Sequence, residues 1–546
     1  MSDLSYFLGI DVGTGSTRAA LVAQNGQILA VSVEEIKTFT SSEGHLEQSS
    51  SNIFEGIVKN VREVLKKCPD SGKVRGIGVC ATCSLVAIDK NGEPVSVSLS
   101  GRQDQNIILW MDHRAKVEAD IINGKKHEIL KFVGGQVSLE MEVPKLMWLK
   151  RNLRENFEKV AHFFDLPDFI TWKLTGGSPE RSVCSLVCKW NYDAINGKWC
   201  DDFLRDLDLG EIASDNFERL GNKVQSPGEA IKAGLSPEIA KIFGLRPGIA
   251  VASSMIDAHC GALGVLGCQL EGLPSTSSLT SKLAIIAGTS SCHMSITREP
   301  LYVDGIWGPY YNAMFPKTFL NEAGQSTSGH LLDFVIESHP AYSTLKNNFL
   351  TKVEIVRHLN ALIQQMTKDG EIFHEITKNY HVYPDFHGNR SPFANPDLKG
   401  MICGLTLEND ERNLAKLYLA TMQALAYGTK LIIDQLYDAG REKFAAVLMC
   451  GGLSKNEIFV QTHADVLEMP IGLPETTEAV LLGGAILGAC AAQLYPTLED
   501  ATNAMSGNAK TIHSNHKSFD FHRKKYKVFR KMVQDQLEYK RIMDGN

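Results

Sequence analysis

The first eighty residues alternate short apolar runs with turns. Tyr6 to Asp11 is an apolar run that ends in a carboxylate, and small residues follow it in a turn. Thr17 to Val22 and Gln27 to Val33 are two more strand-like runs, and they meet at Asn25-Gly26, a strong hairpin signal. The pattern predicts strand, turn, strand, hairpin, strand. Two further elements are predicted: a helix from Asn52 to Lys67, with apolar residues at helical spacing, and a strand from Gly76 to Ala81.

The opening pattern recurs near the middle of the chain. Leu283 to Ser291 repeats the strand, Gly-Thr and small-residue order of Phe7 to Ser16, and Cys292 to Ile296 reads as the strand that follows. Leu270 to Ser281 is rich in Gly, Pro, Ser and Thr and reads as a connection. Two such matches, half a chain apart, predict duplicated domains at 1–272 and 273–546 with facing phosphate turns.

The second half of the chain carries long helical patterns. They cover Glu411 to Ala439, Asn456 to Leu467 and Glu478 to Leu494. The run Ala445 to Gly452 lies between the first two and reads as a buried strand that ends in a glycine pair. Because strands alternate with helices, we expect an α/β architecture with partly parallel sheets.

Composition narrows the class of protein. The 546 residues are 43% hydrophobic and 22% charged, enough to bury large cores, and the net charge of −7 gives no general attraction for nucleic acid or anionic membrane. The N-terminus lacks a basic, apolar signal peptide, and no run of about 20 apolar residues predicts a spanning helix. We therefore expect a cytoplasmic protein.

The cysteines indicate reduced thiols. Twelve are scattered along the chain, several in apolar runs, which is typical of small buried hydrophobes and not of a disulfide framework. Cys80 and Cys83 form a C-x-x-C, but no second pair or histidine accompanies it at ligand spacing, so we expect a structural pair. Cys184 and Cys188 form a looser pair far away in the sequence.

The turn after the first strand carries the first candidate chemistry. Its glycines, Gly13 and Gly15, let backbone N–H groups approach an anion closely. The turn matches neither common phosphate-loop fingerprint, because Arg18 replaces the last glycine and a strand follows. Asp11 would repel a phosphate unless Mg²⁺ lay between them, so we expect a magnesium role for it; the alternative is a carboxylate that caps a hairpin turn. The residues expected to hold the nucleotide phosphates are Gly13, Thr14, Gly15, Ser16, Thr17 and Arg18.

Two further turns are candidates for the nucleotide site. Gly451-Gly452 follows a buried strand and precedes a helix, and without side chains it lets a flat adenine or a ribose lie against the backbone. By itself it reads equally as a helix-entry turn. Gly288-Thr289, in the repeat, supplies the third small-residue turn after a strand, and three such turns can converge on one nucleotide.

Asp257 is the candidate general base. It lies where an apolar strand gives way to a helix, and small residues around it leave room for a substrate. An aspartate in that place can also be only a helix N-cap. His259 is a weaker competitor, because two residues along a helix it faces another direction.

Further motifs are spread along the chain in a specific order. Together with the turns already described, they are Asp11 to Arg18, Trp110 to Arg114, Trp172 to Gly176, Asp257 to Gly264, Gly288-Thr289, Asn321 to Ser326, Gly388 to Pro392, Gly400 to Thr406 and Cys450 to Gly452. No single motif is decisive, but their joint order and spacing are highly specific. By these motifs the chain resembles the FGGY family of carbohydrate kinases along nearly its whole length.

The resemblance implies two ribonuclease-H-like domains of the actin-like ATPase fold with a cleft between them. It implies that ATP binds mostly to the C-terminal domain, near Gly288, Thr289, Gly451, Gly452 and Asn456, and that the sugar binds mostly to the N-terminal one. It implies that Asp257 is the base, supports the magnesium role of Asp11, and implies in-line transfer of the γ-phosphoryl group to a primary sugar hydroxyl.

The substrate is narrowed by resemblance within the family. Where glycerol kinases carry an Arg-Glu pair, this chain has Thr82-Cys83-Ser84, as ribulose kinases do, and Cys188-Lys189-Trp190 is similar to them too. This likeness implies D-ribulose as substrate and D-ribulose 5-phosphate as product. The residues expected to hold the sugar are Thr82, Cys83, Ser84, Trp110, Asp112, Lys189, Asp257, Glu322 and Gln325.

Other functions stay open from the sequence alone. L-ribulose, ribitol and xylulose are alternative acceptors, and a non-catalytic actin-like nucleotide switch would share the phosphate turns without needing Asp257, Lys189 or Glu322. A NAD-dependent oxidoreductase is excluded by the first turn. The partner we expect is a small sugar, with neither nucleic acid nor membrane, and the oligomeric state is left open, a homodimer included.

Overall fold

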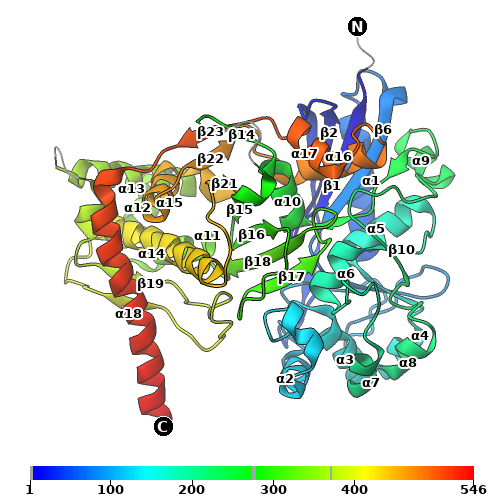
Figure 1. Ribbon diagram of the computed structural model, residues 1–546, viewed down its shortest axis with the longest axis horizontal. Coiled ribbons are helices and arrows are strands. Elements are labelled where there is room, and N and C mark those ends of the chain that lie inside the picture. Colours follow the sequence, from blue (N-terminus) through cyan, green and yellow to red (C-terminus); the bar gives the residue numbers. More distant parts are fainter. Residues whose placement is uncertain (1–3, 273–277, 369–371, 546) are drawn as a thin grey trace. The chain divides into compact units, whose positions relative to one another are not determined.

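The computed structural model describes residues 4–272, 278–368 and 372–545 of the chain. They form two compact units, each assembled from several stretches of sequence. The first unit takes Met1–Gln269, Met294–Asn321 and Pro474–Asn508, and the second takes Leu270–His293, Glu322–Leu473 and Ala509–Asn546. Figure 1 follows the chain from its N-terminus to the long C-terminal helix.

The strands of the first unit make two main sheets and one short parallel pair. The larger sheet has the order β12-β6-β1-β2-β3, with β13 also paired to β6, and the smaller has the order β4-β5-β8-β7-β9. Strand β17 also belongs to this unit. The strands are β1 (Tyr6–Val12), β2 (Ser16–Ala23), β3 (Ile28–Glu35), β4 (Thr38–Thr40), β5 (Leu46–Gln48), β6 (Val74–Ala81), β7 (Leu85–Ile88), β8 (Ile107–Ile108), β9 (His162–Asp165), β10 (Glu180–Ser182), β11 (Lys223–Gln225), β12 (Ala250–Val251), β13 (Met255–Ile256) and β17 (Trp307–Tyr311).

The helices of the first unit surround these sheets. They are α1 (Ser50–Leu65), α2 (Lys116–Lys125), α3 (Glu142–Asn152), α4 (Arg154–Lys159), α5 (Leu166–Thr175), α6 (Val183–Lys189), α7 (Asp201–Asp206), α8 (Gly210–Ser214), α9 (Pro237–Phe243), α10 (Asp257–Leu266), α16 (Ala479–Ala491) and α17 (Leu498–Met505).

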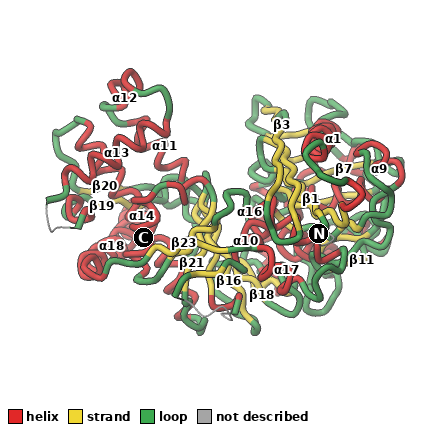
Figure 2. Tube along the Cα trace, turned by 90° about the horizontal axis from the view of Figure 1, so that it is seen from above, coloured by secondary structure: helices red, strands yellow, loops and turns green. Residues whose placement is uncertain are grey.

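Strand β1 is buried on both faces, and its side chains alternate between two helices. Leu8 and Ile10 lie in the core that α1 covers, and Figure 2 shows α1 beside the strands β1 and β3. The intervening Gly9 faces α16: a Cβ at this position would lie 2.0 Å from the carbonyl oxygen of Leu481. The period of two along a strand thus assigns the bulky residues to one helix and the glycine to the other.

The second unit is a mixed sheet with helices packed around it. Within it the strands follow the order β14-β23-β22-β21-β15-β16-β18, and β19 pairs with β20. The unit boundaries at His293 and Asn321 fall within β16 and β18. The elements are β14 (Gln269–Leu270), β15 (Lys282–Ala287), β16 (Ser291–Thr297), β18 (Phe319–Gln325), β19 (His381–Tyr383), β20 (Met401–Cys403), β21 (Ala446–Cys450), β22 (Ile471–Pro474), β23 (Asn508–Ile512), α11 (Gly329–Ser338), α12 (Tyr342–Asn348), α13 (Lys352–Met366), α14 (Glu411–Asp438), α15 (Glu457–Leu467) and α18 (Phe519–Asp544).

The predicted elements are confirmed to within a few residues at their ends. The opening strands, the helix after them, the repeated strand Lys282–Ala287 and the long helix Glu411–Asp438 all form. Part of the predicted connection, 273–277, lies outside the described residues. All twelve cysteines are free thiols, as expected. Over the described part of the chain, every helix is too short or too polar to cross a bilayer.

Candidate functional site

The first phosphate turn joins β1 to β2. The Gly13 N–H donates to the carbonyl of Ser16 at 2.9 Å and closes the turn. A Cβ at Gly15 would meet no heavy atom within 4 Å, so packing inside the protein does not require glycine there, and the backbone lies open to a ligand. Thr14 is held beside it, because its hydroxyl accepts from Trp110 Nε1 at 3.0 Å and its carbonyl accepts from Gln48 Nε2 at 2.8 Å.

Thr17 faces away from this turn. Its side chain is buried, and its hydroxyl accepts a hydrogen bond from Asn60 Nδ2 of α1 at 2.9 Å. Its structural role is therefore to fix β2 against α1. Ser16, by contrast, is half-buried at the turn itself.

The carboxylate of Asp11 is fully buried and is paired with a cation. Arg18 Nε donates to Asp11 Oδ2 at 2.8 Å, a second Arg18 nitrogen also bonds it, and Arg18 reaches Glu478 at 3.3 Å. Asp11 and Arg18 are direct partners in the antiparallel register of β1 and β2. Burial raises the pKa of Asp11 even though Arg18 opposes the rise. The sequence suggested a bare carboxylate; the structure supplies Arg18 as its partner.

Asp257 is the first residue of α10, directly after β13. This strand pairs in parallel with β6, through Ile256 and Ala81, and β6 pairs in parallel with β1. Asp11, near the end of β1, and Asp257, just after β13, therefore lie at the same edge of the sheet. Burial, followed by the nearby Asp11 charge, raises the pKa of Asp257 to about 7. Its Oδ1 accepts only from the adjacent N–H of Ala258, at 2.7 Å. A carboxyl that exchanges its proton near neutral pH can act as a general base.

The run Thr82 to Ser84 continues from β6 and lies next to the phosphate turn. The Thr82 N–H donates to the Val12 carbonyl at 2.9 Å, and the Thr82 and Ser84 hydroxyls lie 3.4 Å apart. The Trp110 N–H donates to Ser84 Oγ at 3.1 Å. Since Trp110 also bonds Thr14, the structure brings the predicted sugar residues of this run together with the first phosphate turn.

Asp112 has its carboxylate engaged within the protein. Its two oxygens accept from Arg114, at 2.7 and 2.9 Å, and from the Leu46 N–H at 2.6 Å. Burial opposes ionisation, but the Arg114 hydrogen bonds and charge dominate and lower the pKa of Asp112. The geometry gives Asp112 a role in anchoring its loop and leaves it little capacity to bind a sugar.

Lys189 ends α6 and is buried among acidic side chains that the sequence did not reveal as its neighbours. Its ammonium lies 4.5 Å from the centre of the Trp307 ring, and it interacts electrostatically with Cys83, Glu142 and Asp165. Burial raises the pKa of Glu142 to about 7 and that of Asp165 well above its usual range. Glu142 is paired with the buried Lys145, whose ammonium lies 3.3 Å from Glu142 Oε2, whereas Asp165 Oδ1 is buried without a hydrogen-bond partner. Such an orphaned oxygen is ready to accept from a ligand hydroxyl.

The two turns predicted in the second unit lie at neighbouring strand ends. Strands β15 and β21 are parallel, with Ile286 opposite Cys450, so Gly288 and Gly451 follow them at the same edge. The Gly288 turn holds the start of α11, because its carbonyl accepts from Gly329 N–H at 3.0 Å and the Thr289 carbonyl accepts from Ser328 N–H at 2.8 Å. The structure thus brings Gly288-Thr289 and Gly451-Gly452 together.

Asn456 has its side chain fully committed to the fold. As the N-cap of α15 it accepts from Ile458 and Phe459 N–H at 3.1 and 3.3 Å, and it donates to Tyr418 at 2.8 Å. It positions the helix that follows the glycine pair.

Glu322 and Gln325 lie on β18, and each has a partner. Glu322 Oε1 pairs with Arg390 at 2.6 Å, and Gln325 Nε2 donates to the Leu425 carbonyl at 2.7 Å. Arg390, from the segment Gly388 to Pro392, was not predicted as a site residue. The sequence signal that could have found it is a charged residue inside the turn-like run Asn-Arg-Ser-Pro.

Both units are α/β, and in each of them strands end in small-residue turns of a size that suits an anion. The first unit also carries Asp257, whose pKa is about 7. The chain belongs to the FGGY family of carbohydrate kinases. The model of the family's N-terminal domain matches residues 6–264, and the model of its C-terminal domain matches residues 283–492. The chain is a carbohydrate kinase, and the predicted family is confirmed.

Curated relatives cover nearly all of the chain. An FGGY carbohydrate kinase domain-containing protein of Homo sapiens is 45% identical over 546 residues, 99% of this chain and 98% of its own. A D-ribulokinase of Saccharomyces cerevisiae is 36% identical over 90% of this chain and 72% of its own. A ribulokinase of Shouchella clausii is 30% identical over 96% of this chain and 94% of its own.

Solved structures show the same fold at low identity. A xylulose kinase from Brucella ovis superposes with a TM-score of 0.79 at 19% identity and covers 98% of this chain and all of its own. A Plasmodium falciparum glycerol kinase, solved with ADP, has a TM-score of 0.77 at 18% identity and covers 98% of each chain. These matches confirm the predicted actin-like α/β fold.

Proposed function

We propose that this kinase transfers the γ-phosphoryl group of ATP to the primary hydroxyl of a ketopentose, with D-ribulose as substrate and D-ribulose 5-phosphate as product. The observation that carries the chemistry is Asp257, whose pKa of about 7 suits a base at neutral pH. The relatives named D-ribulokinase and ribulokinase support ribulose as the sugar.

Asp257 accepts the proton of the primary hydroxyl while the hydroxyl oxygen bonds to the γ-phosphorus. The bond from that phosphorus to the bridging oxygen of ADP breaks, and ADP leaves with the electron pair. Because the chemistry needs little covalent help, the protein acts mainly by positioning both reactants and by offsetting negative charge.

Each unit offers backbone groups that suit a nucleotide phosphate. In the first unit they are those of Gly13 and Gly15, with the Ser16 hydroxyl beside them, and in the second unit they are those of Gly288-Thr289 and Gly452. Gly452 is open, since a Cβ there would meet no heavy atom within 4 Å. Backbone N–H groups in such turns bind anions without needing a net positive protein.

The carboxylates near Arg18 fit a divalent cation. Asp11, Asp257 and Glu478 are three carboxyl groups near the one positive charge of Arg18. Burial raises the pKa of Asp11 and of Asp257; the nearby Glu478 adds to the rise at Asp11, and the nearby Asp11 adds to it at Asp257. Mg²⁺ would neutralise the charge of the phosphates there. Since Asp11 is fully buried and bonded to Arg18, we propose that it holds the ion through water.

The sugar is held around Lys189. Its ammonium donates to sugar hydroxyls, and the unpartnered Oδ1 of Asp165 accepts from them. Thr82 and Ser84 add hydroxyls that can both donate and accept. This set of donors and acceptors can bind more hydroxyls than the three that glycerol has.

A coupled ADP-release assay over D-ribulose, L-ribulose, D-xylulose, ribitol and glycerol tests the proposal. We expect D-ribulose to give the highest kcat/KM and phosphorus NMR to show a phosphate ester on the primary carbon. Asp257→Asn should lower kcat by about 100- to 10,000-fold with ATP affinity nearly intact, whereas Asp120→Asn, at an exposed carboxylate, should behave as wild type. If no sugar stimulates ATP turnover, the nucleotide-switch alternative replaces the kinase proposal. If D257N phosphorylates sugar as wild type does, Asp257 is not the base.

A further inference from the structure

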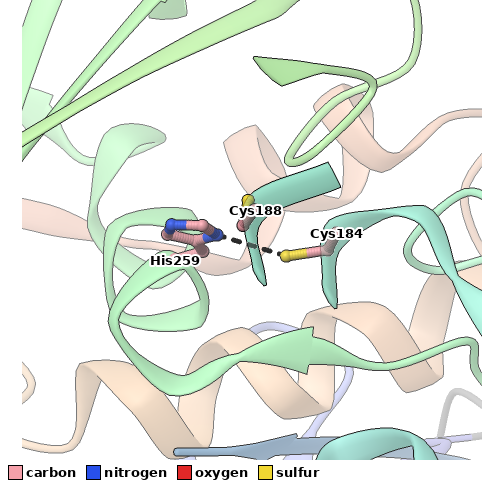
Figure 3. A group of neighbouring side chains, drawn as sticks. All are labelled: Cys184, Cys188 and His259. Atoms are coloured by element: carbon pink, nitrogen blue, oxygen red, sulfur yellow. Dashed lines mark hydrogen bonds between the residues drawn. The ribbon is translucent and has the colours of Figure 1, made fainter. Parts of the chain in front are cut away.

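Three potential metal ligands meet in the first unit at a place that the phosphoryl-transfer chemistry does not use. Helix α6 carries Cys184 and Cys188 four residues apart, which puts both thiols on one helix face. Helix α10 contributes His259 (Figure 3). All three side chains are fully buried, and their donor atoms all lie within 4.8 Å of one another.

The distances are close to those around a tetrahedral zinc ion. Zinc binds sulfur at about 2.3 Å and imidazole nitrogen at about 2.0–2.1 Å, which places neighbouring donors about 3.5–3.8 Å apart. Cys184 Sγ and His259 Nδ1 are 3.1 Å apart, directly facing one another in Figure 3. Small rotations of buried side chains therefore suffice to bring all three donors onto one ion.

The charge of the group also suits a divalent cation. Two thiolates and a neutral imidazole balance Zn²⁺ to zero net charge, so the loaded site carries no unpaired charge into the interior. Soft sulfur donors select zinc over magnesium, which prefers oxygen and keeps its waters. The site is thus chemically distinct from the carboxylates around Asp11.

The helix that carries the two thiols is anchored by its own cap. Ser182 Oγ accepts from Cys184 N–H at 3.2 Å and donates to the Ser254 carbonyl at 2.6 Å. Asp168 accepts from Ser182 N–H at 2.9 Å and from Ser254 Oγ at 2.8 Å. These bonds tie the start of α6 to the segment that leads into α10, so the ligands are held in place before any ion binds.

We propose that Cys184, Cys188 and His259 bind one Zn²⁺ ion that fastens α6 to α10, with water as the fourth ligand. Lys189 follows Cys188 directly, and His259 lies two residues after Asp257. In so far as the proposed function holds, the ion therefore fixes the distance between the lysine that binds the sugar and the carboxylate that deprotonates it.

A second group in the same unit provides a matched control. His127, Cys200 and Asp202 also lie within 4.8 Å of one another, but Asp202 is exposed and the other two are only half-buried. Cys184→Ser and Cys200→Ser make the same chemical change in the two groups. Only the first should affect the proposed zinc site.

The experiment uses the full chain, reduced with a phosphine and stripped of metal by a chelator. Co²⁺ is added as a spectroscopic substitute and is then displaced by Zn²⁺. We expect one equivalent of Co²⁺ to give a thiolate-to-cobalt charge-transfer band, and Zn²⁺ to remove it. In C184S we expect the band to disappear and zinc affinity to fall at least about 100-fold, with C200S unchanged.

Several results would overturn the proposal. They are the absence of a thiolate band in wild type at micromolar Co²⁺, a wild-type band that persists in C184S, and a band that is lost in C200S. Should C184S fail to fold, as judged by circular dichroism, the wild-type spectrum and a His259→Gln variant decide the question. Because metal binding is read without turnover, a zinc-loaded protein that phosphorylates no sugar would refute the proposed function and leave the zinc site standing.

Discussion

Gly451 and Gly452 are adjacent, yet the fold requires glycine only at Gly451. Gly451 has φ +97° and ψ −179°, a backbone region that is nearly reserved for glycine. A Cβ there would lie 2.4 Å from the carbonyl oxygen of Ala287, at the end of β15. At Gly452 a Cβ would meet nothing within 4 Å. We predict that Gly451→Ala damages the fold and that Gly452→Ala damages only nucleotide binding.

The cost of Gly451→Ala can be worked out from these contacts. Holding alanine in the glycine region costs about 1–3 kcal/mol. The clash is with backbone, and β15 is paired with β21, so relief needs a shift of one strand against the other, at about 1–3 kcal/mol more. For a folding unit of about 200 residues, a total of about 2–6 kcal/mol lowers the melting temperature by roughly 5–20 °C.

Differential scanning fluorimetry and ATP kinetics separate the two effects. Gly452→Ala should melt within about 2 °C of wild type, because nothing inside the protein contacts the added methyl. Its KM for ATP should rise about 10-fold or more if the nucleotide lies on this backbone. Equal losses of melting temperature in both variants would refute the steric reasoning for Gly451. An unchanged KM for ATP in G452A would refute the placement of the nucleotide at Gly452.

Three other changes probe the site and its support. Asp112→Asn removes one of the two carboxylates that pair with the buried Arg114, and Glu47 remains as the other. It should therefore cost about 1–3 kcal/mol in urea unfolding, while the KM for sugar of the folded fraction stays as in wild type; a raised KM with normal stability would restore a direct substrate role. Trp110→Phe removes the 3.0 Å hydrogen bond from Trp110 to Thr14. It should raise the steady-state KM for ATP about 3- to 10-fold, because the first turn loses a contact that positions it. An unaltered KM for ATP would show that this bond does not position the turn. Burial lowers the pKa of Lys525 to about 7, so between pH 7 and about 10.5 the unfolded chain holds a proton that the folded chain has shed, and stability rises with pH. Lys525→Met should remove this rise. The free energy of unfolding of the variant minus that of wild type should therefore fall by about 2–4 kcal/mol from pH 7 to pH 10 in urea titrations. Parallel pH profiles of the two proteins would contradict the lowered pKa of Lys525.

Local pattern was enough to predict the elements that carry the site. The Asn25-Gly26 hairpin forms with Gly26 at φ +85°, and Asp257 lies at the predicted strand-to-helix junction. Both follow from short-range rules about turns and periodicity. The His259 ring lies against Cys184, at 3.1 Å.

Long-range packing was not accessible in the same way. Helix α16 comes late in the sequence, yet it packs in the first unit, where Gly484 and Gly488 lie against Gly78 and Gly76. The sequence does contain the glycines of this contact, which are four residues apart on the helix and two residues apart on the strand. Which helix meets which strand depends on close backbone approach across about 400 residues, and periodicity in one segment does not encode that.

The site residues show why residue type alone misassigns roles. Asp112 and Asn456 are chemically suitable for ligands, but the fold already uses their hydrogen-bonding capacity, so a ligand would have to break existing bonds. Asp165 stood unnoticed in a largely apolar segment, yet its Oδ1 is buried and has no hydrogen-bond partner within the described protein. A buried acceptor without a partner costs free energy that a bound hydroxyl can return, and a saturated one offers no such gain. By this criterion we propose that the sugar binds near Lys189 and Asp165.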